Sequence, residues 1–249
     1  MDENDRDAPP KGPSMSELLT GVHLVEGVAM PGRPGVVNVC MLVYDGEATL
    51  VDAGFPGITG PLERAFAEAE ISPHDVKRII ITHFHSDHIG GLVEAVALTG
   101  AEVWAHEEDA GFIDGSIPTP GPSPAMLESM RAQGRTPRPG PEPVPVGRRL
   151  QGGETFDALG GVEVLHTPGH TPGHISLLLP ETSLLIAGDM LRYEDGRVVR
   201  PPEMFGWDLD VAERSIRAVA ALEFDSMLPY HGDFLPHEAA RSIRRDLFA

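Results

Sequence analysis

Three histidines and one aspartate lie within six residues of this chain, in the segment HFHSDH at positions 83–88. Imidazole nitrogens and carboxylate oxygens are ligands for divalent metals. His83 and His85 are two residues apart, so in an extended segment their side chains point the same way. Asp87 and His88 follow at the expected start of a helix and point to a second location. The spacing therefore predicts two adjacent metal ions rather than one.

Four further residues of ligand type follow apolar segments later in the chain. They are His170 and His174 in the double turn TPGHTPGH, Asp189 after the run IAG, and His231 in PYHG. The Thr-Pro-Gly turns restrict the backbone and can aim a side chain. Taken singly these signals are weak, because an aspartate after a buried strand is as often a helix cap. The other histidines match no motif and are expected at the surface or satisfied in the core: His23, His74, His106, His166 and His237.

The expected secondary structure places these residues after strands. The apolar run at 77–82 is typical of a strand covered on both faces, and the carboxyl ends of such strands are where open α/β folds place their sites. The pair Asp45-Gly46 predicts a hairpin turn. Further strands are expected at 36–44, 48–51, 101–105, 162–166, 175–179, 183–187 and 227–229. Helices are expected at 60–69, 88–98, 124–133, 211–222 and the C-terminus.

The chain is expected to form one domain after a short tail. Residues 1–15 are acidic, contain prolines and offer nothing to bury, so they predict a flexible N-terminal tail. Residues 16–249 are expected to fold together. Within them, the segment 109–149 holds nine prolines around one plausible helix, with Met126, Leu127 and Met130 on one helix face. This Pro-rich insertion is either a surface excursion or a lid over the site.

The amino-acid composition limits the classes of molecule that this protein is expected to bind. There are 19 basic and 38 acidic residues, a formal net charge of −19, so the field of the protein repels nucleic acids and anionic membranes. Cys40 is the single cysteine, which excludes an internal disulfide and a cysteine-rich zinc site. Neither a signal peptide nor a membrane-spanning run is recognised. We expect a cytoplasmic protein that acts on a small molecule, and the sequence leaves its oligomeric state open.

The order of these motifs resembles that of the metallo-β-lactamase-fold superfamily. HFHSDH, TPGHTPGH, AGD and PYHG occur in the superfamily's order, and LVDAG at 50–54 matches its first motif. The resemblance runs from about residue 23 to the C-terminus, and its layout is most similar to compact lactonase-like and general hydrolases. It implies an α+β fold, the αβ/βα sandwich. In that fold two mixed β-sheets pack face to face, with helices on the outer faces and metals at one edge.

The resemblance also implies a set of metal ligands. Asp52 would accept a hydrogen bond from a ligand histidine and fix its tautomer, and His174 would support the site without binding metal. The nitrogen and oxygen ligands suit two zinc ions and are compatible with iron or manganese. One ion would be held by His83, His85 and His170, the other by Asp87, His88 and His231, with Asp189 bridging both.

Such a centre predicts hydrolysis. Two divalent ions bridged by a carboxylate hold a hydroxide that can attack a carbonyl, and Asp87 is the expected catalytic group that moves a proton to the leaving group. A carbonyl ester is the expected substrate, with lactones favoured. The alternatives are a thioester hydrolase similar to glyoxalase II, a mononuclear-iron persulfide dioxygenase, and a metal-stabilised protein that binds a partner. Only 18 residues follow His231, whereas glyoxalase II-type enzymes continue into a helical domain.

Four residues are candidates for a substrate pocket. Lactonases of this fold have a tyrosine three residues after the bridging aspartate, and here Tyr193 is four residues after Asp189. Met204, Phe205 and Trp207 could wall an apolar pocket for an acyl chain, with the face of the 124–133 helix as its roof. Ordinary packing of these side chains in the core is the competing interpretation.

Overall fold

The computed structural model describes residues 15–28, 37–121, 124–134, 136 and 140–249. Of the expected tail, only Met15 falls among these residues, and it begins the first strand rather than belonging to a tail. The side chain of Met126 also lies outside the described part. None of the helices found in the described ranges has both the length and the apolar character needed to cross a bilayer.

The first sheet has seven strands in chain order. The first four pair antiparallel, and β4 to β7 pair parallel. Asp45 and Gly46 both have positive φ, 48° and 76°, in the expected hairpin turn between β3 and β4. The strands are β1 (Met15–Leu19), β2 (Val22–Val25), β3 (Cys40–Tyr44), β4 (Glu47–Val51), β5 (Val76–Ile81), β6 (Glu102–His106) and β7 (Arg148–Leu150).

The second sheet has five strands in the order β14-β11-β10-β9-β8, and a separate ribbon pairs β12 with β13. Within the five-stranded sheet, only β11 and β14 pair parallel. Both large sheets are therefore mixed, as expected. The strands are β8 (Thr155–Phe156), β9 (Val162–His166), β10 (Ile175–Leu179), β11 (Leu184–Gly188), β12 (Arg192–Glu194), β13 (Arg197–Val199) and β14 (Ser226–Pro229).

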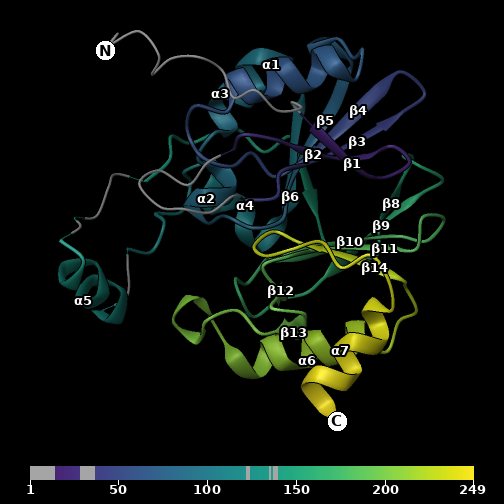
Figure 1. Cartoon of the computed structure of the whole chain (residues 1–249). Coiled ribbons are helices and arrows are strands. Elements are labelled where there is room, and N and C mark those ends of the chain that lie inside the picture. The colour runs from purple at the N-terminus through teal and green to yellow at the C-terminus, as the bar shows by residue number, and fades with distance from the viewer. Residues whose placement is uncertain (1–14, 29–36, 122–123, 135, 137–139) are drawn as a thin grey trace, which may run out of the picture.

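Helices cover the outer faces of the two sheets, which confirms the α+β sandwich (Figure 1). The seven-stranded sheet carries α1 (Thr59–Glu68) and α3 (Leu92–Thr99), and the five-stranded sheet carries α6 (Leu209–Ala220) and α7 (Ala239–Phe248). Two short helices follow β5 and β6: α2 (Ser86–Ile89) and α4 (Glu107–Ile113). The remaining helix, α5 (Pro124–Ala132), is set apart from both sheets in Figure 1. Single 3-10 turns occupy Pro73–Asp75 and Glu203–Phe205.

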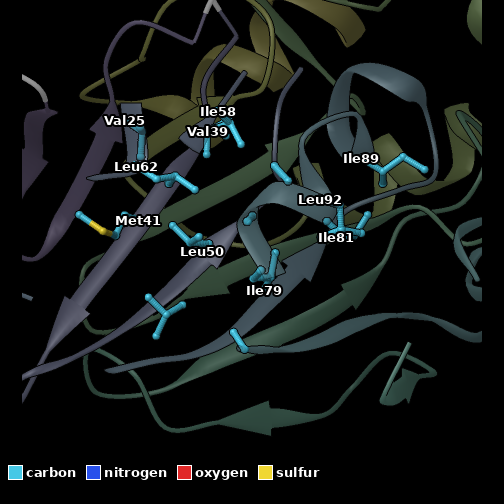
Figure 2. Close-up of a cluster of buried hydrophobic side chains, with 14 of the residues drawn as sticks. Val25, Val39, Met41, Leu50, Ile58, Leu62, Ile79, Ile81, Ile89 and Leu92 are labelled. Carbon is cyan, nitrogen blue, oxygen red and sulfur yellow. The ribbon is translucent and has the colours of Figure 1, made fainter. Parts of the chain in front are cut away.

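Three apolar layers hold this arrangement together, and β5 shows how the sequence builds them. Ile79 and Ile81 pack under α1 and α3, in the cluster of Figure 2. Ile80 points the opposite way, into the layer between the two sheets. Because alternate side chains face opposite sides of a strand, a strand covered on both faces must be apolar throughout. The third layer joins the five-stranded sheet to α6 and α7.

The expected helix over 88–98 is divided in two. Helix α2 ends at Ile89 and α3 begins at Leu92, with Gly90 and Gly91 between them. A Cβ atom at Gly91 would collide with the carbonyl oxygens of Ala53 and Phe55. The two glycines therefore let the loop after β4 pack against the break. The apolar period that predicted one helix does not report this close backbone approach.

Candidate metal centre

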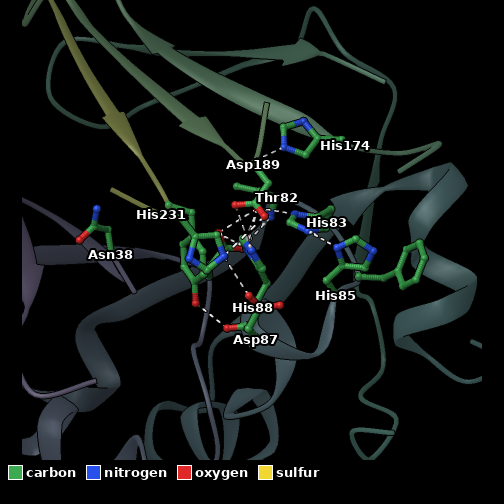
Figure 3. Close-up of polar contacts among 12 residues, drawn as sticks. Asn38, Thr82, His83, His85, Asp87, His88, His174, Asp189 and His231 are labelled. Atoms are coloured by element: carbon green, nitrogen blue, oxygen red, sulfur yellow. Dashed lines mark hydrogen bonds and ion pairs between the residues drawn. The ribbon is translucent and has the colours of Figure 1, made fainter. Parts of the chain in front are cut away.

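Loops at one edge of the sandwich bring the expected ligands together. The segment 83–88 follows β5, the loop 167–174 joins β9 to β10, Asp189 follows β11, and His231 lies just after β14. Figure 3 shows the side chains of His83, His85, Asp87, His88, Asp189 and His231 directed towards one another. Residues up to 148 positions apart in the chain thus meet at one place.

A first group consists of three histidines, His83, His85 and His170, whose ligand atoms lie within 4.8 Å of one another. Nδ1 of His85 is 2.9 Å from Nε2 of His83 and 3.0 Å from Nε2 of His170. Burial and the neighbouring rings lower the pKa of all three, to about 3 for His85. The rings are therefore neutral at pH 7. One ring nitrogen has a single lone pair and cannot serve two donors, so a cation between the three nitrogens satisfies them better.

A second group consists of Asp87, His88 and His231. Nε2 of His231 lies 3.0 Å from Oδ2 of Asp87. Burial would raise the pKa of Asp87, but the hydrogen bond from His231 and the charge of His88 lower it. This carboxylate is therefore ionised at neutral pH.

Asp189 lies between the two groups. Its Oδ2 is 3.4 Å from Nε2 of His170 and 3.6 Å from Nε2 of His231. Its Oδ1 is 3.5 Å from Nε2 of His88. Burial would raise the pKa of Asp189, but His88, His231 and His170 hold it well below its usual range. The carboxylate thus has one neighbour in the first group and two in the second, which is the placement expected of a bridging ligand.

Unpartnered polar atoms show that the centre suits cations. Among the described residues, Nε2 of His88 and Oδ1 of Asp189 are buried without a hydrogen-bond partner, although they face each other. Buried polar atoms almost always have partners. Burial lowers the pKa of His88, but the carboxylates of Asp52 and Asp189 outweigh it and raise the pKa to about 10. A proton on His88 thus supplies the positive charge that a metal ion would bring, so these residues fit a divalent cation.

Asp52 orients the ring of His88 through a hydrogen bond. His88 donates from Nδ1 to Oδ2 of Asp52 at 2.9 Å, and the backbone N–H of Thr82 donates to Oδ1 at 2.8 Å. The Thr82 hydroxyl also donates to Oδ2, at 2.8 Å. Asp52 is 1% exposed. Because Nδ1 of His88 carries the donated proton, Nε2 is the nitrogen that faces Asp189, which is the effect expected of Asp52.

His174 supports Asp189 through the backbone and lies outside the ligand groups. The N–H of Asp189 donates to Nε2 of His174 at 3.0 Å, so Nδ1 carries the proton and donates to the Thr167 hydroxyl at 2.8 Å. The hydroxyls of Thr167 and Ser176 are 3.0 Å apart, and Ser176 donates to the carbonyl of Ala187. All these side chains are buried. The chain of donors fixes the turn that carries Asp189.

We expect His174→Phe to destabilise the fold and to leave the six candidate ligands other than Asp189 in place. Phenylalanine keeps a ring but leaves the buried N–H of Asp189 without its partner, at a cost of about 1–3 kcal/mol. The Thr167 hydroxyl loses its contact with His174 and keeps the one with Ser176. Denaturant unfolding of the metal-free protein measures the change. His237→Phe is the control, because His237 is exposed and pairs with Asp225 at the surface. Equal stability of both variants would contradict the expectation.

Two residues that no sequence motif indicated hold the second group. Tyr230 donates from its hydroxyl to the carbonyl of Asp87, and its ring lies against His88 with centroids 3.6 Å apart. Asn38 donates from its side chain to the carbonyls of Pro229 and Gly232, on either side of His231. The position of Tyr230 directly before His231 was a usable signal. Asn38 lies 193 residues away and carried none.

Tyr193 lies beside the loop of His231 through its backbone, which pairs with Gly232, and its carbonyl accepts from the N–H of Asp233 at 2.9 Å. Its side chain is partly buried against the apolar layer under α6 and α7. The part of its hydroxyl in binding substrate stays a prediction.

Met204, Phe205 and Trp207 are exposed rather than packed in the core, at 40%, 36% and 57%. The N–H of Trp207 donates to the carbonyls of Gly169 and His170. Its ring lies 6.5 Å from that of Phe112, which in turn is 4.4 Å from Phe84. Trp207 thus exposes apolar area beside the loop of His170, and Met204 and Phe205 are exposed just before it in the chain. A roof from α5 stays a prediction.

One further histidine group does not converge. His106, Glu108 and His166 lie close together, but the two rings stack at 3.9 Å and 14°, so their nitrogens do not point to a common centre. Nδ1 of His106 accepts from the N–H of Glu108, and Nε2 of His166 lies 3.0 Å from the carbonyl of Pro172. This agrees with the expectation that both histidines are satisfied locally.

Comparisons with known proteins show which family and fold this chain is similar to. The family model described as the metallo-beta-lactamase superfamily matches residues 32–231. The probable metallo-hydrolase YflN of Bacillus subtilis is 28% identical, covering 87% of this chain and 85% of the relative. The hydroxyacylglutathione hydrolase GloC of Haemophilus influenzae is 31% identical, covering 61% and 66%. A metallo-beta-lactamase family protein from Thermus thermophilus has a TM-score of 0.67 and 28% identity, covering 92% and 78%.

Proposed function

Because the chain belongs to the metallo-β-lactamase superfamily, we propose that it is a dinuclear metallohydrolase that cleaves a carbonyl ester of a small molecule, lactones included. One observation carries the proposal. Five imidazoles and two carboxylates from four separate loops converge, and two of their buried atoms, Nε2 of His88 and Oδ1 of Asp189, face each other without a hydrogen bond.

The proposed ligand sets follow the two groups and the bridging carboxylate. His83, His85 and His170 would hold one divalent cation, Asp87, His88 and His231 the other, and Asp189 both. Nitrogen and oxygen donors in this number favour zinc, with iron and manganese as the alternatives. When bound, two such cations supply Lewis-acid activation of water and of the scissile carbonyl.

Asp87 is the proposed proton carrier. Its Oδ2 is held by Nε2 of His231, and its side chain remains 24% exposed, so a substrate can approach it. Because its pKa is lowered, the carboxylate is ionised at neutral pH. It can accept the proton of the attacking water and pass it to the leaving oxygen. The two carboxylates leave the centre with a net positive charge when two divalent cations are bound, which favours an anionic transition state.

The surroundings favour a substrate with an apolar part. Trp207 exposes apolar area beside the His170 loop, and Met204 and Phe205 are exposed apolar residues just before it in the chain. A formal net charge of −19 repels polyanions such as nucleic acids. Thioesters are a second candidate class, supported by the 31% identity to the hydroxyacylglutathione hydrolase GloC.

The test combines metal analysis with a substrate panel. Protein purified without added metal is analysed for zinc, iron and manganese, and is then assayed against lactones, aryl esters, thioesters, phosphodiesters and β-lactams. The proposal expects two metal ions per chain and hydrolysis of an ester or lactone. Hydrolysis of thioesters alone would move the assignment to the second candidate. One iron with oxygen consumption on a persulfide, or two metals with no turnover of any substrate, would overturn it.

We expect Trp207→Ala to lower kcat/KM for an octanoyl ester about tenfold, with little change for the acetyl ester. Loss of about 50 Å² of apolar contact at about 25 cal/mol/Å² corresponds to that ratio. Steady-state kinetics on the two esters measure it. Val93→Ala is the control, because Val93 is an exposed apolar residue of α3, on the helical layer outside the seven-stranded sheet. Equal losses on both esters would contradict binding of the acyl chain here.

A further inference from the structure

A buried carboxylate outside the ligand groups joins the two loops that carry the three histidines. Asp109 is the third residue of α4, directly beyond β6, and its side chain is fully buried. Aspartate is almost never fully buried unless it is paired. The partners of Asp109 are three uncharged donors: the N–H of Phe84 at 3.2 Å, the hydroxyl of Thr171 at 2.6 Å and the N–H of Gly173 at 2.7 Å.

These donors belong to the two loops of the first group. Phe84 lies between His83 and His85, and Thr171 follows His170 in the chain. Oδ2 of Asp109 accepts from Phe84 and Thr171, so one oxygen atom ties both loops together. At Gly173 a Cβ atom would lie 2.8 Å from the carboxylate, so glycine is required for the approach. No such contact joins Asp109 to Asp87, His88 or His231 among the described interactions.

All three partners donate hydrogen bonds to Asp109, so its side chain must offer an acceptor to each of them. A carboxylate offers only acceptors, whereas an asparagine side chain would turn an N–H₂ group towards one of the N–H donors. Burial raises the pKa of Asp109 and the three donors oppose that shift, so the pKa is about 6 and the carboxylate is mostly ionised at pH 7. Among the described residues its side-chain hydrogen bonds all go to the two loops.

We propose that Asp109 is a positioning residue that sets the distance between His85 and His170 and thereby the metal affinity of the three-histidine group. The inference rests on the metal centre of the proposed function. It extends the proposed function by giving Asp109 an effect on the affinity of one metal position and none on the other. Asp109 governs the position formed by His83, His85 and His170, and leaves the position formed by Asp87, His88 and His231 unaffected.

The experiment measures zinc affinity at each position by competition with a chromophoric chelator, together with calorimetry. The same measurement is made in the His231→Ala protein, which lacks a ligand of the second position. The affinity measured there is that of the first position. We expect Asp109→Asn to weaken binding at the three-histidine position about 10–100-fold, the scale at which residues supporting a ligand act. The second position should change by less than about threefold, because Asp109 makes no contact with it.

Two further variants keep the inference testable if Asp109→Asn folds poorly. Thr171→Val removes one of the three donors and should weaken the same position by a smaller factor, whereas Thr171→Ser keeps the hydroxyl and should restore wild-type affinity. Asp114→Asn is the matched control, because Asp114 is the C-terminal cap of the same helix and pairs with Ser116 and Arg149. It should leave both affinities unchanged.

The outcomes separate this inference from the proposed function. Equal losses at both positions in Asp109→Asn would indicate a structural role only and overturn the inference. Unchanged affinities in folded Asp109→Asn and Thr171→Val would overturn it as well. In both cases the wild-type protein still binds two zinc ions, so the proposed function stands. A wild-type protein that binds no zinc, iron or manganese would contradict both.

Discussion

Replacing Asp189 with asparagine is expected to lower kcat for the best ester or lactone substrate by about 10³-fold or more, the scale on which a charged group at a reacting centre acts. Asp189 is the residue whose carboxylate faces both ligand groups, with neighbours at 3.4, 3.5 and 3.6 Å. Asparagine keeps the shape and removes the charge. We therefore also expect the second metal ion to be lost, because the amide is a much weaker ligand than a carboxylate.

Initial rates at saturating substrate and metal content by elemental analysis give the two readouts. Asp195→Asn is the control, since Asp195 lies in the exposed turn between β12 and β13 and removes the same charge from the protein. The control should retain full activity. An Asp189→Asn protein that holds two metals and turns over normally would refute the bridging role.

The second large effect is expected from Asp52→Asn. The amide cannot accept from Nδ1 of His88 and from Thr82 at the same time, so the tautomer of His88 is no longer enforced. We expect metal affinity to fall about 10–100-fold. In the metal-free protein we expect a loss of about 1–3 kcal/mol in the free energy of unfolding, since a buried charged acceptor is removed.

The pH dependence has a definite sign. The pKa of His88 is raised to about 10 against an ordinary value of about 6.5. The stabilisation from its pairing with Asp52 is therefore fully present below about pH 6.5 and disappears as the pH rises through about 10. The difference in unfolding free energy between wild type and Asp52→Asn, measured by denaturant titration, should shrink over that range. A difference that grows with pH would contradict the pairing.

Asp45→Asn is the matched control for Asp52→Asn. Both aspartates have a left-handed backbone, with φ of 48° at Asp45 and 64° at Asp52, and asparagine tolerates that conformation. Asp45 is exposed in the β3–β4 turn, so its replacement should change neither stability nor metal affinity. A loss confined to Asp52 then reports the contact with His88 rather than backbone strain.

Local sequence signals were sufficient to predict most of the strands and the family. The continuous apolar run of β5 predicted a strand covered on both faces, and Ile79, Ile80 and Ile81 fill two different layers as that requires. The order of the motifs predicted the superfamily and its α+β sandwich, and both are confirmed. Short edge strands such as β7 and β12 gave no signal, since three residues cannot show a period.

Contacts over long sequence distances escaped the sequence analysis. In the sequence, Asp109 is only the first residue of a Pro-rich segment, although its side chain joins residues 25 and 62 positions away. Tyr193 nearly matches the spacing of the lactonase tyrosine, and only the structure shows that its side chain packs against the layer under α6 and α7. Met204, Phe205 and Trp207 could equally have belonged to a core, and only their measured exposure places them at the surface.

The sequence by itself determined which chemistry this protein carries, because ligand types, turn residues and apolar periods are local and survive without coordinates. The tertiary structure decided how those groups relate: which nitrogen of His85 faces its neighbours, which atoms of His88 and Asp189 lack partners, and which carboxylate ties two loops together. The reason is physical. Hydrogen bonds act over about 3 Å, and distances on that scale between remote residues are set by the packing of the two sheets and the helices that cover them.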